Sequence, residues 1–274
     1  ETKSQKMKTE LLSNVSHDLK TPLTSLISYI DLMKQEGLDS PHAPEYLEIL
    51  DEKTQRLKVL TENLFEAAKA SSGAIPVHME TIDLGSLVSQ SLGEMSERLT
   101  AQKLDIIVEN HCAQGPDVAG MQDAEGGVLS AGPRVMADGQ LLWRVIENLL
   151  SNVSKYALPG SRVYLDISSV NRKAGSAAGT TASAGCSTSA GTASAGAAAN
   201  GFVLLEVKNI SRDRLNISAD ELMERFKRGD ESRNTEGSGL GLAIARDLTK
   251  LMNGVFEITV DGDLFKASVL LKQA

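Results

Sequence analysis

The chain has 274 residues, with 28 basic and 36 acidic side chains and a formal net charge of −8 at pH 7. The acidic balance argues against a nucleic-acid-binding protein, whose binding surface is basic. The widely separated Cys112 and Cys186 support neither a disulfide framework nor a metal site, and no apolar run approaches the roughly 18 residues that a membrane span needs. The length and the 41% apolar content leave one large domain or two modest ones.

Residues 1–72 predict an antiparallel helical hairpin. Apolar residues recur every three or four positions in two series, as on one face of a helix, and Gly37, Pro41 and Pro44 separate the series. The series are Leu12, Val15, Leu19, Leu23, Leu26, Ile30 and Met33, and then Tyr46, Leu50, Leu57, Leu60, Leu64 and Ala67. Because two helices alone would leave this apolar stripe half covered, we expect a homodimer that forms a four-helix bundle. On spacing alone, a dimeric coiled coil without chemistry remains the alternative.

Residues 77–274 predict an α+β domain, in which helices cover one side of a mixed sheet. Asp83 and Asp138 are expected to cap helices that carry residues 84–99 and 139–156, and Asp261-Gly262 is typical of a hairpin turn. A further helix is expected at 238–252, and strands are expected at 104–109, 162–170, 202–207, 255–260 and 264–270. We interpret the segments at about 112–133 and 173–200 as flexible insertions, since the second is almost entirely Ala, Gly, Ser and Thr.

His17 is the first candidate functional residue. It lies about 160–200° around the helix from the apolar seam, which predicts an exposed imidazole that is near neutral and free to act as a nucleophile. Thr21 shares its face one turn later, Asp18 is adjacent, and Pro22 is expected to interrupt the helix after these groups. The position alone is also compatible with an ordinary solvated histidine.

A second polar group, Asn148, Asn152, Lys155 and Tyr156, shares one face of the helix predicted at 139–156. An apolar stripe lies about 100° around that helix, so the polar face is expected at the rim of a cavity. Amide oxygens suit Mg²⁺ and a lysine suits phosphate, although a plain polar helix face has the same spacing.

The third group is the sequence GSGLGL at residues 237–242. Glycines let backbone N–H groups approach a phosphate closely at the start of a helix, whose dipole favours anions. A short glycine cluster is also typical of a flexible turn, and no strand leads directly into this one as in a dinucleotide fingerprint.

Together these groups resemble the motifs of sensor histidine kinases, in the order in which that family has them. The sequence SHDLKTPLT at residues 16–24 resembles the phospho-acceptor motif. The resemblance implies that His17 is autophosphorylated, that Asp18 assists as the acid/base neighbour of the ring, and that Thr21 positions water for dephosphorylation of a partner.

The sequence ENLLSN at residues 147–152 resembles the Asn box of the family's ATP-binding domain. The resemblance implies that Asn152 ligates Mg²⁺, that Asn148 supports the metal-phosphate site, and that Lys155 and Tyr156 line the nucleotide site. GSGLGL resembles the second glycine box, which assigns phosphate binding to Gly237, Gly239, Leu240 and Gly241. Arg228 lies in a segment that resembles the start of the ATP lid, and it is a candidate to meet phosphate.

One box departs from the family's pattern. Where most members have an Asp followed by glycines, the sequence VKNISRD at residues 207–213 places Asn209 and lacks both glycines. An amide oxygen can still accept a hydrogen bond from the adenine amino group, but the bond is weaker without the charge of a carboxylate.

On this resemblance we expect ATP- and Mg²⁺-dependent autophosphorylation of His17, phosphoryl transfer to an aspartate of a response regulator, and phosphatase activity on that regulator. A hinge at about residues 70–76 would let the ATP-binding domain reach His17. Because the chain begins at Glu1 and not at Met, we expect the cytoplasmic portion of a longer protein anchored in the cell membrane. Two alternatives are another ATPase of the same superfamily, against which SHDLKTPLT argues, and a non-catalytic signalling scaffold, which Asn209 suggests.

Overall fold

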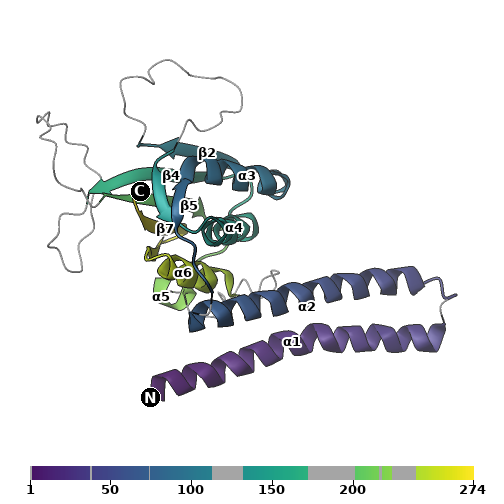
Figure 1. Cartoon of the computed structure of the whole chain (residues 1–274). Helices are drawn as coiled ribbons and strands as arrows, with labels where there is room; N and C mark the ends of the chain where they lie inside the picture. Colours follow the sequence, from purple (N-terminus) through teal and green to yellow (C-terminus); the bar gives the residue numbers. More distant parts are fainter. Residues whose placement is uncertain are drawn as a thin grey trace, which may run out of the picture.

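A computed structural model of the chain describes residues 2–37, 39–73, 75–112, 132–171, 201–215, 218–223 and 239–274, and it places a helical hairpin beside an α+β domain (Figure 1). Up to Asp18 the description covers the backbone of the first helix and not its side chains. Most of both predicted insertions, together with Arg228 and Gly237, lies outside these residues.

The hairpin consists of α1 (Thr2–Glu36) and α2 (Ala43–Ser72), which pack against each other along their length as predicted. Its turn is fixed by Glu36, whose carboxylate accepts hydrogen bonds from Ser40 Oγ at 2.8 Å and from Tyr46 Oη at 3.0 Å. Within the described ranges, no helix has the length and apolarity that crossing a membrane requires.

One expectation about the hairpin is wrong. Pro22 lies inside α1 and does not interrupt it, since a proline removes a single backbone donor while the neighbouring turns continue. Of the segment predicted as a hinge, at about residues 70–76, residues 70–72 still belong to α2. Gly73 then ends α2 in a left-handed conformation, with φ of 68°, which glycine adopts without steric cost.

A five-stranded mixed sheet forms the α+β domain, in the order β2-β4-β5-β7-β6. β2 runs parallel to β4, and the other neighbours are antiparallel. The strands are β2 (Asp105–Asn110), β4 (Arg162–Asn171), β5 (Gly201–Ile210), β6 (Val255–Asp261) and β7 (Leu264–Lys272). Alternate residues of β5 and β7 are buried, as expected for a sheet with one covered face.

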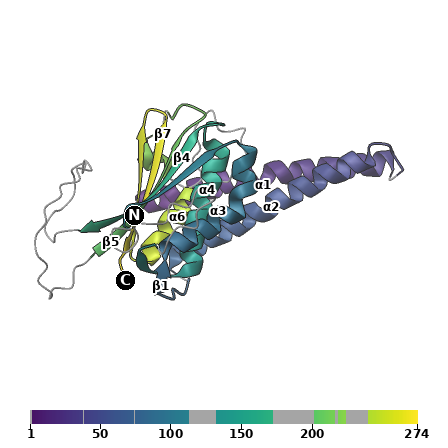
Figure 2. The same ribbon diagram turned by 90° about the horizontal axis from the view of Figure 1, so that it is seen from above.

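Three helices cover that face, as Figures 1 and 2 show: α3 (Leu84–Ala101), α4 (Gly139–Tyr156) and α6 (Gly241–Leu251). These positions confirm the predicted α+β class, and α6 begins three residues later than expected. The sequence did not predict the small sheet of β1 (Glu80–Asp83) and β3 (Arg134–Ala137) or the four-residue α5 (Ala219–Leu222). Such short elements carry too few residues for a recognisable period.

Asp138 fixes both the start of α4 and the chain that enters the domain. Its Oδ1 accepts hydrogen bonds from the backbone N–H groups of Gln140 and Leu141 at 3.0 and 3.1 Å. Its Oδ2 accepts from the backbone N–H of His78 at 2.8 Å. One buried carboxylate therefore joins the interdomain segment to the helix that carries the polar residues described below.

Replacing Asp138 with alanine is expected to lower the free energy of unfolding of the domain by about 2 kcal/mol, because a helix cap and a second buried N–H lose their acceptor. Urea denaturation measures this value. Asp138→Asn keeps the Oδ1 acceptor of the helix cap but not the Oδ2 acceptor of the His78 N–H, so it should lose less than Asp138→Ala, and an equal loss in both variants would contradict the assignment.

Candidate nucleotide site and phospho-acceptor helix

Helix α4 presents two asparagines one turn apart, at the border of its buried face. Its apolar side, Leu142, Val145, Ile146, Leu149, Leu150 and Val153, is almost fully buried in the core. Asn148 and Asn152 lie at the edge of this stripe and are half-buried. Asn148 Nδ2 donates a hydrogen bond to the Arg144 carbonyl at 2.8 Å, which fixes the side chain and leaves its Oδ1 directed away from α4.

Both amide oxygens lie close to Gly241, the first residue of α6. A Cβ atom placed on Gly241 would be 3.0 Å from Asn148 Oδ1 and 3.8 Å from Asn152 Oδ1. Glycine is therefore the residue that lets the start of α6 approach α4 this closely. Two motifs that lie far apart in the sequence meet at this point.

The N-terminus of α6 adds positive character to the same place. Gly239 has φ of 63° and turns the chain into the helix, and the buried Leu240 provides no side-chain cap. The first backbone N–H groups of a helix have no carbonyl partner within it, and they carry the positive end of the helix dipole. Such a terminus binds anionic groups such as phosphate.

Asn152 provides a direct test of whether a ligand fits here. Its Nδ2 is buried and has no hydrogen-bond partner among the described residues. A buried donor of this kind is expected to have a partner, and an acceptor oxygen of a bound ligand would provide one. The amide oxygens are hard ligands of the type that Mg²⁺ accepts, so the residues present fit a phosphate chain with its metal ion.

The C-terminal end of α4 is joined to the end of β5. The backbone N–H of Arg212 donates to the carbonyl of Tyr156, and that of Leu158 donates to the carbonyl of Ile210, both at 2.8 Å. This connection places Asn209 near the end of α4, on the buried face of β5 and only 4% exposed. Asn209 Nδ2 donates to the Ile210 carbonyl at 3.3 Å, which orients the amide. Lys155 is exposed on the last turn of α4.

On the hairpin, α1 carries the sequence around His17. Residues 17 and 18 lie within the helix as predicted, and their side chains are outside the description. Thr21 is exposed. The structure does not bring α1 to α4, because α2 lies between α1 and the α+β domain (Figure 1) and packs against α6.

Two family models match the two parts of the chain. The model of the His Kinase A (phospho-acceptor) domain matches residues 7–73, and that of the histidine kinase-, DNA gyrase B- and HSP90-like ATPase matches residues 137–272. The chain belongs to the sensor histidine kinases. The first match contains α1 from Met7 onward, with His17, and the second contains α4 and α6 with the asparagines and Gly241.

Individual kinases agree with this assignment. The chain is 26% identical over 254 residues to the sensor protein VanSC of Enterococcus gallinarum, and this match covers 92% of the chain but 57% of VanSC. The structure of the histidine kinase AdeS of Acinetobacter baumannii has the same fold, with a TM-score of 0.63 at 16% identity, covering 94% of this chain and 98% of AdeS. A structure of the kinase ThkA in complex with the response regulator protein TrrA gives a TM-score of 0.61 at 15% identity, covering all of this chain and 64% of that one.

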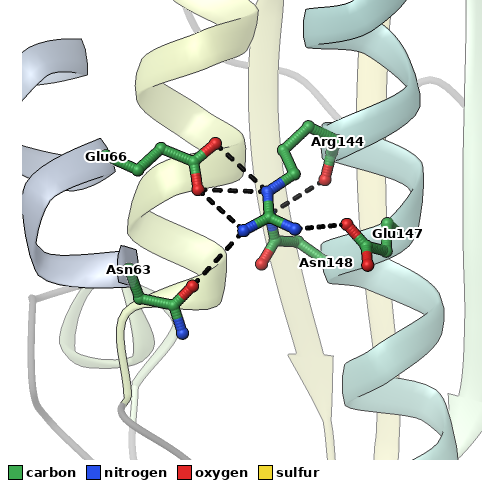
Figure 3. Close-up of polar contacts among 5 residues, drawn as sticks. All are labelled: Asn63, Glu66, Arg144, Glu147 and Asn148. Atoms are coloured by element: carbon green, nitrogen blue, oxygen red, sulfur yellow. Dashed lines mark hydrogen bonds and ion pairs between the residues drawn. The ribbon is translucent and has the colours of Figure 1, made fainter. Parts of the chain in front are cut away.

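Sequence reasoning on this kinase missed one residue of the region, Arg144. It precedes Asn148 by one turn of α4, and its side chain binds Glu66 of α2 (Figure 3). No local pattern reveals such a pair, because its two members are 78 residues apart. The position of Arg144 on the same helix face as the Asn box was the one sequence feature that could have pointed to it.

Replacing Gly241 with alanine is expected to lower the affinity for ADP or a non-hydrolysable ATP analogue about tenfold, since the new Cβ would displace Asn148 Oδ1. Isothermal titration calorimetry with Mg²⁺ present measures the affinity. Gly93→Ala is the matched control, because Gly93 is exposed in α3 and its added Cβ meets open space. Equal affinities in the two variants would contradict the role given to Gly241.

Proposed function

We propose that this chain is the catalytic core of a sensor histidine kinase, which phosphorylates His17 with ATP and passes the phosphoryl group to an aspartate of a response regulator. The observation that carries the proposal is the meeting of Asn148 Oδ1 and Asn152 Oδ1 with the start of α6 at Gly241, where Leu240 provides no side-chain cap. Amide oxygens beside a helix N-terminus suit a metal-bound triphosphate.

In this proposal the residues of the site have separate roles in binding the metal ion, the phosphates and the adenine. Asn152, supported by Asn148, would hold Mg²⁺, which supplies charge neutralisation at the phosphates when bound. The backbone N–H groups that follow Gly239 and Leu240 would bind phosphate oxygens, while Lys155 and Tyr156 line the nucleotide. Asn209 accepts a hydrogen bond from the adenine amino group. Gly237 and Arg228, which lie outside the described residues, belong to the same proposal.

In the transfer step, the unprotonated ring nitrogen of His17 attacks the γ-phosphorus in line. A nitrogen–phosphorus bond forms while the bond from phosphorus to the bridging oxygen breaks, and ADP leaves. Asp18 accepts the hydrogen bond of the other ring nitrogen and stabilises the positive charge that develops on the ring. Catalysis of this type depends mainly on positioning.

A homodimer completes the helical domain in this proposal. The hairpin exposes large apolar side chains that a monomer would leave in water, including Leu23 at 49%, Ile27 at 54% and Phe65 at 64% exposure. A second copy that packs on this face would form a four-helix bundle and bury them.

The whole protein is longer in this proposal than the chain, which spans 57% of the length of VanSC. We place the chain on the cytoplasmic side of a parent anchored in the cell membrane. The response regulator is the partner, as the complex of ThkA with TrrA illustrates for that kinase. Another ATPase of the superfamily would need no phospho-acceptor domain at residues 7–73.

The test is incubation of the chain with γ-labelled ATP and Mg²⁺. The chain is expected to gain an acid-labile label, and His17→Gln is expected to lose it while binding nucleotide with unchanged affinity. Label that persists in His17→Gln would show that His17 is not the residue that accepts the phosphoryl group. Absence of both label and nucleotide binding in the unchanged chain would favour the non-catalytic scaffold.

Thr21 is expected to serve the reverse reaction. Thr21→Ala should reduce dephosphorylation of a phosphorylated response regulator at least about tenfold and leave autophosphorylation within about twofold, because the exposed hydroxyl orients water and does not hold ATP. Phosphate release from the regulator and labelling of His17 measure the two activities. Equal losses in both would reject this assignment.

A further inference from the structure

Arg144 connects the nucleotide-binding helix α4 to the helical hairpin. Its Nε lies 3.1 and 3.0 Å from the two carboxylate oxygens of Glu66 on α2, and one terminal nitrogen lies 2.9 Å from Glu66 Oε2 (Figure 3). The same nitrogen lies 3.4 Å from Asn63 Oδ1. A bidentate contact of this kind fixes the orientation of the guanidinium relative to the carboxylate as well as the distance between them.

The second terminal nitrogen of Arg144 donates to Glu147 Oε2 at 2.5 Å. The three charged side chains are partly shielded from water, with exposures of 33% for Arg144, 22% for Glu66 and 30% for Glu147. Burial opposes the charge on Arg144, but the hydrogen bonds to Glu66 and Glu147 outweigh it, so the pKa of the guanidinium is raised. Such a pair holds its geometry better than an exposed ion pair does.

Among the described residues, small apolar side chains also join the hairpin to the domain at this place. Ala67 and Ala70 of α2 are buried and belong to the core cluster of the domain, and α2 packs against α6. Alanine side chains bury little apolar surface, so their contribution to docking is small. The contact between Glu66 and Arg144 is the directional interaction between the hairpin and the domain.

This docked arrangement keeps α2 between α1 and the nucleotide site. Transfer requires the reacting atoms to be about 3 Å apart and aligned. The ATP-binding domain must therefore leave its place beside α2 before its nucleotide can reach His17 on α1 of the same chain.

We propose that Glu66 and Arg144 are a positioning pair, which holds the ATP-binding domain at rest against α2 and opens when the domain moves to His17. The inference rests on the proposed function. It assigns neither residue to the chemistry or to nucleotide binding, so loss of the pair changes the rate of transfer and not the affinity for ATP.

The test is Glu66→Gln, which keeps the size of the side chain and removes its charge. Autophosphorylation is expected to accelerate about fivefold in kcat with an unchanged KM for ATP, since the resting arrangement loses a charged contact. Glu62→Gln is the matched control, because Glu62 is exposed one turn earlier on α2. An unchanged or lower kcat in Glu66→Gln overturns the inference.

A charge exchange separates positioning from general destabilisation. Glu66→Arg alone should accelerate autophosphorylation, and the double variant with Arg144→Glu should return kcat to within about twofold of the original value. A double variant as fast as the single one overturns the inference.

Amide hydrogen exchange measures docking without any need for kinase activity. Exchange at residues 63–70 of α2 is expected to be faster in Glu66→Gln than in Glu62→Gln, because release uncovers this part of the helix. Equal exchange in the two variants overturns the inference. A chain that never becomes labelled but shows this difference would reject the proposed function alone.

Discussion

The packing of α4 against the sheet is the interaction on which the rest of the structure depends. The apolar stripe of α4 is almost fully buried, and this burial fixes the rotation of the helix about its own axis. That rotation puts Asn148 and Asn152 at the edge of the core, where Gly241 can approach them. It also directs Arg144 to the hairpin and aligns the end of the helix with β5.

The close approach of α6 to α4 brings together two short motifs that lie far apart in the sequence. Together they place two amide oxygens, a buried amide donor and the first backbone N–H groups of α6 in one region of the described structure. In the proposed function, the hard oxygen ligands would hold the metal and the positive helix terminus would hold the phosphate of the same ligand.

The sequence predicted those parts that obey a local rule. The two hairpin helices follow from apolar spacing, the starts of α3 and α4 follow from Asp83 and Asp138, and the last hairpin follows from Asp261-Gly262. The pair of Glu66 and Arg144 follows from no local rule, because only the folded chain joins these residues. The continuity of α1 through Pro22 depends on the rest of a long helix, which outweighs one missing donor.

The bond from Asp138 to the backbone of His78 sets the length of the tether between the domains. Helix α2 ends at Ser72, Ile75 and Val77 already pack against the core of the domain, and His78 is bound to Asp138, so at most five residue steps separate Gly73 from a point fixed in the domain. A fully extended chain covers about 18 Å over that distance. This short connection lets the domain rotate about the end of α2, but it does not let the domain move freely along the hairpin. Most of the repositioning must come from rotation about the end of α2.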